Sequence, residues 1–540
     1  MDSHAKIRRV TLFAALAITA VIAVLHLEFR SVAGGLWRDE AMLVHYAQLD
    51  SARNLTHDSF PALMATVIHG WGKIFSTSDV SLRWLGALIG LGVIGALWAS
   101  VWSARRSPPL VGLALLGLNS VVIIYGDSVR AYGLGSLLVV LLVGVMWWFL
   151  KNPSWRRTGI LLSAALLAVQ ALFQNAVLFA GICGGAWVVC GRRKNFSAAL
   201  KILGVGVVAA ASLLPYWDNF FPKGNGTSAV RSVFCWPEVC GNLTVCLGAY
   251  ACLWLVLAVA VVAIGVWSGR ENQVTTSDEK DLPLFAGVTL LLGGAGFFWF
   301  LWFSALNTQI WHFPSLLAFA AVCFDLGLPY ENKKLRVPWF GFALALALIA
   351  APFAGRELHW RFTPVDLLAA RLNAETAPED LVLVTPWYVS TTFERYYRAP
   401  APWDAVPPVR AAKLGTNQAP DFFFRVTEQM TNPAALRPQL AKISATLQAG
   451  HRVWVVGWLS LPEFGTPYPP DLPPAPLRAT GWSDTPYTLH WNDQIANFLV
   501  QHSRELGRVS VPSPVALDWH ENVELFRATG WRTNVDGKSF

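Results

Sequence analysis

The sequence predicts a polytopic α-helical membrane protein with a soluble α/β domain at its C-terminus. Hydrophobic residues make up 54% of the 540 residues and charged residues only 14%, whereas a soluble globular protein carries about 25% charge. Apolar blocks long enough to cross a bilayer recur up to residue 354, and a polar segment with short β-branched runs follows. We therefore expect a transmembrane domain over residues 1–354 and an extracytoplasmic α/β domain over residues 355–540.

A membrane-spanning helix needs roughly 20 apolar residues. The first apolar block follows Lys6, Arg8 and Arg9 and looks like a signal peptide, but many similar blocks come after it, so we expect an uncleaved helix. About eleven spans are predicted. They cover residues 10–27, 82–102, 109–125, 132–150, 159–173, 176–190, 198–217, 246–267, 283–303, 313–328 and 339–353.

The distribution of Lys and Arg predicts the orientation, because cytoplasmic connections are enriched in both. With the N-terminus inside, the cytoplasmic connections hold roughly 17 basic residues and the outer ones about 8. The expected location is the cell inner (plasma) membrane, with a cytoplasmic N-terminus and an extracytoplasmic C-terminal domain. These basic clusters also explain the net charge of +8, so nucleic acid is not an expected partner.

The seven cysteines include no CxxC and no zinc spacing. Cys235 and Cys240 lie in one short polar stretch, where they would form a disulfide in an oxidising compartment or remain two free thiols. No cofactor is indicated, and a divalent metal ion is compatible with the sequence but not implied by it.

The first outer loop, residues 28–81, is too long for a simple turn and has its own helical pattern. Residues 41–49 predict a short helix. Residues 60–75 are amphipathic and aromatic-rich, which favours a helix in the membrane interface over an ordinary surface helix. Asp39 and Glu40 open this loop. A carboxylate there can act as general base on an acceptor hydroxyl, and the alternative is a solvated acidic pair.

A second group of charged residues joins two apolar blocks at residues 125–132. Charges so close to apolar blocks usually face a bundle interior or a water-filled cavity. Arg130 has the fork geometry that suits phosphate oxygens. The alternatives are snorkelling to the headgroups or an ion pair with Asp127. Residues 307–312 form a third polar patch, in which His312 is more typical of a satisfied interfacial histidine than of a ligand.

Three stretches of the sequence resemble the GT-C superfamily of membrane glycosyltransferases, in particular its bacterial protein-mannosyltransferase-like and aminoarabinose-transferase-like members (families 39 and 83). Residues 36–47, which begin Leu-Trp-Arg-Asp-Glu-Ala, resemble the first-loop Asp-Glu motif of that group. Residues 57–63 and 81–86 resemble its next block, where a "PPL" and an "LR" recur. Residues 128–134 are similar to the "AR-x-Y" opening of a later helix. The order and spacing of these motifs make the resemblance specific over residues 36–150.

The resemblance implies transfer of a sugar from a polyprenyl-phosphate carrier to an acceptor hydroxyl on the outer face, with inversion, in cell-envelope synthesis. It implies that Asp39 is the catalytic carboxylate with Glu40 beside it, and that Arg130 and Arg83 bind the phosphate of the sugar donor. The expected partners are this lipid-linked sugar, membrane lipids, and an acceptor glycan, lipid or protein. Further candidates for the substrate site are His57, Asp58, Asp127, Tyr132, Gln309 and His312.

The chain departs from the group's pattern at two places. One proline of the "PPL" is replaced, giving Pro61-Ala62-Leu63, and Gln174-Asn175 stands where some relatives have His and Tyr. These departures bear on the identity of the donor more than on the reaction class.

In the C-terminal segment, residues 381–385 and 452–456 predict strands, residues 433–448 and 493–503 predict helices, and residues 521–526 predict a last strand. This alternation is typical of a small α/β domain, and no nucleotide-binding motif is present. Five aromatic residues would either stack on a sugar or pack in the core. These are Trp387, Tyr388, Phe393, Tyr396 and Tyr397.

Two other functions compete with glycosyl transfer. A lipid or solute transporter often shows two related halves and broken helices, and the sequence indicates neither. A non-catalytic relative that serves as a scaffold is the other alternative, and the presence of both Asp39 and Arg130 argues against it.

Overall fold

The computed structural model describes residues 3–48, 60–104, 107–217, 234–270, 278–304, 308–328, 336–408, 426, 428–475, 484–517 and 521–533. Two compact units are distinguished. The first, here the helical unit, holds the described residues up to residue 31 and from residue 60 to His359. The second, here the mixed unit, holds residues 32–48 together with the described residues from Trp360 onward. The sequence placed all of residues 28–81 with the membrane helices, whereas residues 32–48 cluster with the mixed unit.

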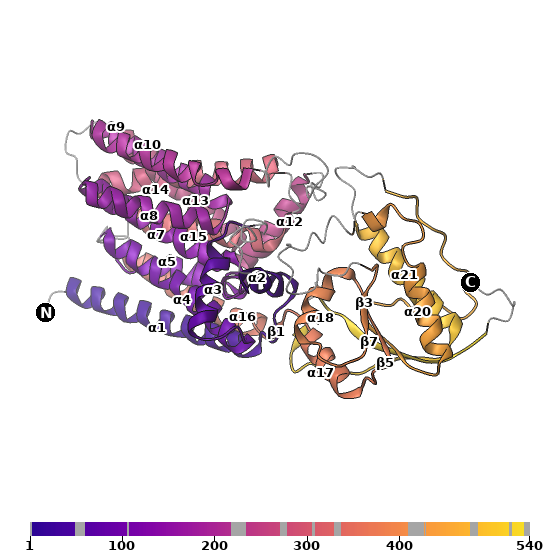
Figure 1. Cartoon of the computed structure of the whole chain (residues 1–540). Helices are drawn as coiled ribbons and strands as arrows, with labels where there is room; N and C mark the ends of the chain where they lie inside the picture. The colour runs from indigo at the N-terminus through magenta and orange to yellow at the C-terminus, as the bar shows by residue number, and fades with distance from the viewer. Residues whose placement is uncertain are drawn as a thin grey trace. The chain divides into compact units, whose positions relative to one another are not determined.

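The chain is a multi-pass membrane protein. Eight helices among the described residues are long and apolar enough to cross a membrane. They are α1 (Ser3–Val32), α4 (Asp79–Ser103), α7 (Ala131–Lys151), α9 (Gln174–Arg192), α10 (Phe196–Ala211, continued by the 3-10 turn η3, Leu214–Tyr216), α13 (Ala251–Arg270), α14 (Asp278–Ser304) and α16 (Arg336–Glu357). In front of α13, α12 (Trp236–Leu247) and the turn η4 (Gly248–Tyr250) lengthen the same span. Each of these eight spans falls on an apolar block that the sequence predicted (Figure 1).

The three other predicted blocks are shorter helices or broken ones. They are α8 (Trp155–Ala171), α15 (Pro314–Gly327) and the block at residues 109–125. That last block consists of α5 (Leu110–Gly112), the π-helical turn η2 (Leu113–Gly117) and α6 (Ser120–Gly126). The side chain of Asn119 accepts the N–H of Val122 at 3.0 Å and so starts a new helix inside the apolar block. The expectation that no helix is broken is therefore wrong at this position.

Buried carboxylates join helices within the helical unit. Asp281 of α14 is 1% exposed and accepts from Nε of Arg193 at 2.6 Å, while Nε of Arg192 lies 3.4 Å from its other oxygen. Asp325 of α15 accepts the N–H groups of Val111 and Gly112 at 3.3 and 2.9 Å. A carboxylate at this helix start satisfies backbone donors that have no partner inside the helix.

The mixed unit is built on a five-stranded sheet in the order β3-β2-β4-β7-β5. The strands are β2 (Leu381–Val384), β3 (Trp403–Ala405), β4 (Val453–Gly457), β5 (Ser503–Val509) and β7 (Glu524–Trp531). β2 pairs in parallel with both β3 and β4, and β7 runs antiparallel between β4 and β5. Two further strands, β1 (Trp360–Arg361) and β6 (Ala516–Leu517), form a separate parallel pair. The predicted α/β domain is confirmed.

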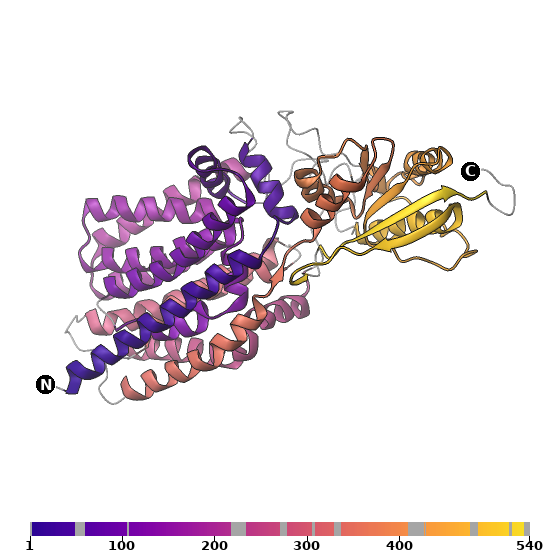
Figure 2. The ribbon, with the colours of Figure 1, turned by 90° about the horizontal axis from the view of Figure 1, so that it is seen from below.

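Helices cover both faces of this sheet (Figure 1). Alternate residues of β2 point to opposite faces, as strand geometry requires. Leu381 and Leu383 pack with α20 (Arg437–Gln448) and α21 (Thr485–His502). Val382 and Val384 pack with α17 (Val365–Glu375) and α18 (Ser390–Tyr396). Figure 2 shows the long strands β5 and β7 running beside each other along this layered unit.

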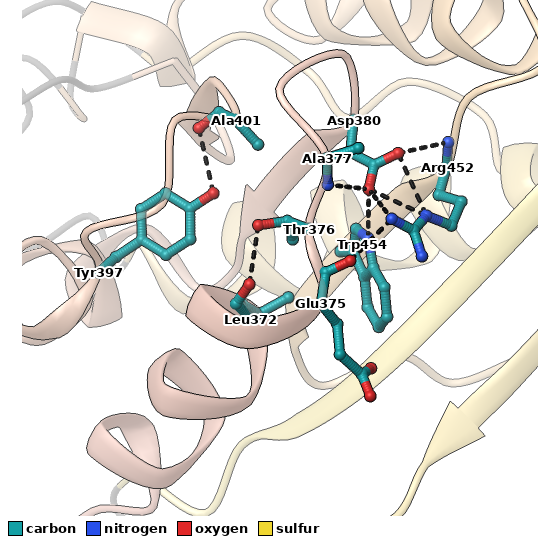
Figure 3. A network of polar contacts seen from close by, with 9 residues as sticks. All are labelled: Leu372, Glu375, Thr376, Ala377, Asp380, Tyr397, Ala401, Arg452 and Trp454. Carbon is teal, nitrogen blue, oxygen red and sulfur yellow. Dashed lines mark hydrogen bonds and ion pairs between the residues drawn. The ribbon is translucent and has the colours of Figure 1, made fainter.

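A buried ion pair ties the starts of β2 and β4 together (Figure 3). Asp380, which is 1% exposed, accepts from Nε of Arg452 at 3.0 Å and from the indole N–H of Trp454 at 3.2 Å. It also accepts the backbone N–H groups of Ala377 and Arg452, each at 3.0 Å. Burial raises the pKa of Asp380, but these hydrogen bonds outweigh burial, so its pKa lies below the usual value.

Candidate functional site

The Asp-Glu pair lies in the first turn of helix α2 (Arg38–Gln48). The carbonyl of Trp37 accepts the N–H of Ala41 at 2.8 Å, and the N–H of Trp37 donates to Oε2 of Glu40 at 3.3 Å. This second bond is one half of a capping box. Glu40 is fully buried. Its hydrogen bond from the N–H of Trp37 fixes the start of the helix. The N-terminal end of the helix dipole also favours negative charge at both positions.

Asp39 is held by its neighbour in the chain. Nε of Arg38 donates to Oδ1 of Asp39 at 2.7 Å. The Asp39 side chain is 12% exposed and that of Arg38 is 31% exposed. The guanidinium of Arg38 also lies over the ring of Tyr388, 5.1 Å from its centroid. This combination fixes the direction of one carboxylate oxygen while leaving part of the Asp39 side chain accessible.

A second carboxylate, Glu521, faces the same helix start. Its Oε1 accepts the backbone N–H of Arg38 at 2.8 Å, and the hydroxyl of Thr392 donates to the same oxygen at 3.3 Å. Glu521 is 1% exposed. Burial raises the pKa of Glu521 to about 7, against the opposing effects of the Arg38 charge and of hydrogen bonds from Thr363 and the Arg38 backbone. Asp39 and Glu521 therefore flank one arginine.

The segment that leads into α2 is fixed to the rest of the mixed unit. The N–H of Leu36 donates to the hydroxyl of Tyr396 at 2.6 Å. Gly34 has a φ of +70°, and a Cβ there would collide with the guanidinium of Arg361. Arg361 in turn donates to Asp366 at 2.6 Å. The motif that the sequence singled out is thus positioned by residues more than 300 places further along the chain.

In the helical unit, Asp127 and Arg83 lie in one buried polar group. Oδ1 of Asp127 is 2.7 Å from Nδ1 of His26, and both side chains are 3% exposed. Arg83 is 4% exposed and close enough to act on Asp127 electrostatically. Arg83, Gly86 and Gly90 share one face of α4, since residues three and four apart are helix neighbours. A Cβ at either glycine would collide with Asp127.

Arg130 lies at the start of α7 and is 2% exposed. Its guanidinium lies over the ring of Phe60, 4.6 Å from the centroid. Phe60 also meets Tyr132 edge-to-face at 5.4 Å, and Tyr132 meets Tyr125 in the same way at 6.3 Å. Tyr125 completes the row by contacting Trp311 at 5.7 Å. The structure therefore places Arg130 and Tyr132, which share one sequence motif, in an aromatic cluster with Phe60 that the motif did not indicate.

Gln309 and His312 form a local turn. The N–H of Gln309 donates to Nδ1 of His312 at 3.0 Å, and the Gln309 side chain accepts from the backbone of His312, which makes a complete capping box. Gln174 donates to the carbonyl of His312 at 2.8 Å. These contacts agree with the expectation of a satisfied histidine.

The remaining candidates from the sequence are His57 and Asp58, the cysteine pair and a metal site. His57 and Asp58 lie outside the described residues. Cys235 and Cys240 are free, exposed thiols. Among the residues that the structure describes, no three or more His, Cys, Asp or Glu side chains gather in a group that could hold a metal ion.

The five aromatic residues near β2 have two different environments. Trp387, Phe393 and Tyr397 are buried in the two cores of the sheet. Tyr388 and Tyr396 are half-buried, and they contact Arg38 and Leu36 respectively. The packing alternative therefore holds for three of the five, and the remaining two support the start of α2.

Sequence reasoning missed three residues of these groups. His26 lies inside the first predicted span, and a histidine within an apolar helix is itself a signal of a polar partner. Glu521 was included only as the start of a predicted strand, and Arg38 only as part of the motif. No local pattern marks the bond between Glu521 and Arg38, because 483 positions separate them.

No family model matches the chain, and no curated protein matches it. Several solved structures are similar to it. ArnT from Cupriavidus metallidurans bound to undecaprenyl phosphate is 13% identical, with 82% of this chain and 92% of that chain covered and a TM-score of 0.46. The apo oligosaccharyltransferase of Archaeoglobus fulgidus is 12% identical, with 82% and 69% covered and a TM-score of 0.49.

Arabinofuranosyltransferase AftD from Mycobacteria is 15% identical, with 98% of this chain and 40% of that chain covered and a TM-score of 0.42. At these identities and TM-scores, the likeness assigns neither a substrate to this chain nor a role to any of its residues.

Proposed function

We propose that this chain is a GT-C-type membrane glycosyltransferase that moves a sugar from a polyprenyl-phosphate carrier to an acceptor hydroxyl. The observation that carries the proposal is the setting of Asp39. It stands in the first turn of α2, its Oδ1 is fixed by Nε of Arg38 at 2.7 Å, and its largely buried side chain keeps 12% of its surface exposed. An oriented, accessible carboxylate is what a general base for a hydroxyl requires.

In the proposed reaction, Asp39 takes the proton of the acceptor hydroxyl while the acceptor oxygen attacks the anomeric carbon. The bond from that carbon to the phosphate oxygen breaks, and the polyprenyl phosphate leaves with the electron pair. Because the phosphate is already a good leaving group, a strong general acid is dispensable. One direct displacement inverts the anomeric configuration. Glu40, through the N–H of Trp37, keeps the first turn of α2 in place.

Arg130 and Arg83 are the proposed contacts of the donor phosphate. A guanidinium presents its N–H groups in a planar fork that matches phosphate oxygens. Both arginines are almost fully buried among helices. The aromatic ring of Phe60 under Arg130 restricts the direction of its guanidinium. Neutralising the charge that develops on the leaving phosphate is the second requirement of this chemistry.

The site is proposed to face the extracytoplasmic side of the cell membrane. The support is the excess of Lys and Arg in the connections on the other side, which predicts a cytoplasmic N-terminus. The acceptor is proposed to be a glycan, lipid or protein of the cell envelope.

The direct test is a screen of radiolabelled polyprenyl-phosphate sugars against the full-length protein in lipid nanodiscs, followed by the same assay on Asp39→Asn. The substitution removes the base but keeps the size of the side chain, and we expect a loss of transfer of about 10²- to 10⁴-fold. Asp493→Asn is the matched control, because Asp493 is exposed on α21. Wild-type turnover in Asp39→Asn would refute the assignment.

Transport is a second candidate because of the helix break at Asn119, since transporters often use broken helices. The same nanodisc preparation tests it after transfer into liposomes. Movement of a polyprenyl-phosphate sugar between leaflets with no glycosylated product would favour transport over transfer.

A further inference from the structure

The start of α2 is held by three residues from other segments of the mixed unit. Oε1 of Glu521 accepts the N–H of Arg38, and the hydroxyl of Tyr396 accepts the N–H of Leu36. The ring of Trp37 stacks on Phe362, with centroids 5.6 Å apart and planes 12° apart. Among these contacts, only the one from Glu521 bears on a backbone group within the helix itself and carries a charge.

Glu521 also has an electrostatic relation to Asp39. Arg38 donates its backbone N–H to Glu521 and its side-chain Nε to Asp39, so both carboxylates face the same residue. The charges of Arg38 and Asp39 both act on Glu521. From the segment after β2, Tyr388 faces the same group, and burial raises the pKa of its phenol to about 12. Thr392 and Thr363 contribute neutral hydrogen bonds.

This arrangement lets Glu521 influence Asp39 without touching a substrate. When Glu521 is ionised, the positive charge of Arg38 is shared between two carboxylates. When Glu521 is protonated, Arg38 is left to Asp39 alone. The hydrogen bond from the Arg38 backbone is available in both states, because a carboxylic acid still has acceptor capacity.

We propose that Glu521 is a positioning residue for Asp39. Glu521 holds the first turn of α2 through the backbone N–H of Arg38, and its charge sets how strongly the Arg38 side chain interacts with Asp39. The C-terminal part of the chain thereby completes the candidate catalytic site. This inference rests on the proposed glycosyltransferase function.

The experiment compares Glu521→Gln and Glu521→Ala with wild type in the full-length protein. Gln keeps an acceptor for the Arg38 N–H but has no charge, whereas Ala lacks both. Glu524→Gln is the matched control, since Glu524 makes a surface pair with Arg508 in which the arginine is 65% exposed. The readouts are kcat and KM for the lipid-linked sugar, the pH profile of kcat, and hydrogen exchange of the amides of residues 38–41.

We expect Glu521→Ala to lower kcat roughly 10- to 100-fold with KM changed little, as for a displaced catalytic group. Exchange at residues 38–41 should accelerate in Glu521→Ala and stay slow in Glu521→Gln. Burial raises the pKa of Glu521 to about 7, and an ionisation near that pH in the wild-type profile should vanish in Glu521→Gln. If Glu521→Ala does not fold, the pH profile of kcat for Glu521→Gln tests the proposal by itself.

The inference is overturned if the Glu521 variants keep the wild-type kcat, pH profile and exchange while Asp39→Asn is inactive. In that case the proposed function stands and only the role of Glu521 fails. If wild type transfers no sugar from any carrier, the proposed function fails. The exchange measurement then still shows whether Glu521 holds the start of α2, and slow exchange in Glu521→Ala removes the positioning role.

Discussion

The backbone N–H of Arg38 donates to Oε1 of Glu521 at 2.8 Å, although 483 positions separate the two residues. This bond joins the short motif after the first membrane helix to the segment just before strand β7. The geometry of this short sequence motif therefore depends on the segment from Trp360 onward. Removal of that segment should therefore affect Asp39 directly.

Thermal unfolding of Glu521→Gln should depend on pH differently from wild type. Burial raises the pKa of Glu521 from 4.5 to about 7, so the folded protein binds this proton more tightly than the unfolded chain does. The stability that the protonated form contributes is present below about pH 4.5 and is lost as pH rises through about 7. Gln imitates the protonated form. Its unfolding midpoint should exceed that of wild type by a few °C at about pH 8 and match it at about pH 4.5.

The prediction is contradicted if the difference between the unfolding midpoints of Glu521→Gln and wild type is the same at all pH values in this range. Glu524→Gln should follow wild type at both ends. A variant that is more stable but less active would separate the functional role of Glu521 from a purely structural one.

Gly90→Ala should destabilise the helical unit. A Cβ at this position would collide with Oδ1 of Asp127 and lie 2.8 Å from Cε1 of His26. Relief of the collision must separate the His26–Asp127 pair, and overpacking of this kind costs about 1–3 kcal/mol. Gly95→Ala is the control in the same helix, since a Cβ there meets nothing within 4 Å. Equal unfolding midpoints for the two variants in detergent would contradict the close approach.

Arg130→Ala should weaken binding of the lipid-linked sugar. The proposal gives Arg130 a phosphate contact, and a hydrogen bond to a charged group contributes about 1.5–3 kcal/mol, so Kd should rise roughly 10- to 100-fold. Arg130→Lys should recover part of the loss, because Lys keeps the charge but not the fork. Phe60→Leu, which removes the ring beneath the guanidinium, should have a smaller effect. Unchanged affinity in Arg130→Ala, measured with labelled polyprenyl phosphate, would remove its phosphate role.

The membrane architecture could be predicted because the hydrophobic requirement of a span is a property of each block by itself. All eleven predicted blocks are helical, in full or in part. The break at Asn119 was missed because it depends on one side chain capping a new helix inside an apolar run. In the mixed unit, β2 and β4 were predicted from their β-branched runs. Strand β5 was missed because its charged sequence has no apolar face to mark it.

The candidate site was predictable only in part. Asp39 and Glu40 were singled out by motif and topology, and the structure adds the reason for their geometry, which is the capping of α2. The partners of that helix were not recognised as such, because Tyr396 was noted only as one of five aromatic residues and Glu521 only as the start of a predicted strand. Long-range pairing of single polar groups leaves no periodic trace, so sequence patterns cannot locate it.

Asp380→Ala should loosen the sheet of the mixed unit. Four donors would lose their acceptor: the backbone N–H groups of Ala377 and Arg452, Nε of Arg452 and the indole N–H of Trp454 (Figure 3). Leaving buried donors unsatisfied costs about 1–3 kcal/mol each, so a loss of at least about 2 kcal/mol is expected. Glu375→Gln is the control, because the Glu375 side chain pairs at the surface with Arg371, whose side chain is 50% exposed, and the substitution keeps the backbone carbonyl that accepts from Arg452.

The same carboxylate predicts an acid-sensitive step in the stability of this unit. Hydrogen bonds hold the pKa of Asp380 below its usual value despite burial. Its contribution is therefore present above about pH 4 and is lost as pH falls through the lowered pKa. The measurement incubates the full-length protein at each pH and then labels it with a deuterium pulse at one fixed pH. The amides of β2 and β4 should lose protection as the incubation pH falls through the lowered pKa of Asp380. Asp380→Asn should be less protected at neutral pH and show a smaller further loss in acid. Identical acid profiles for wild type and Asp380→Asn would mean that other carboxylates govern the acid sensitivity of the sheet.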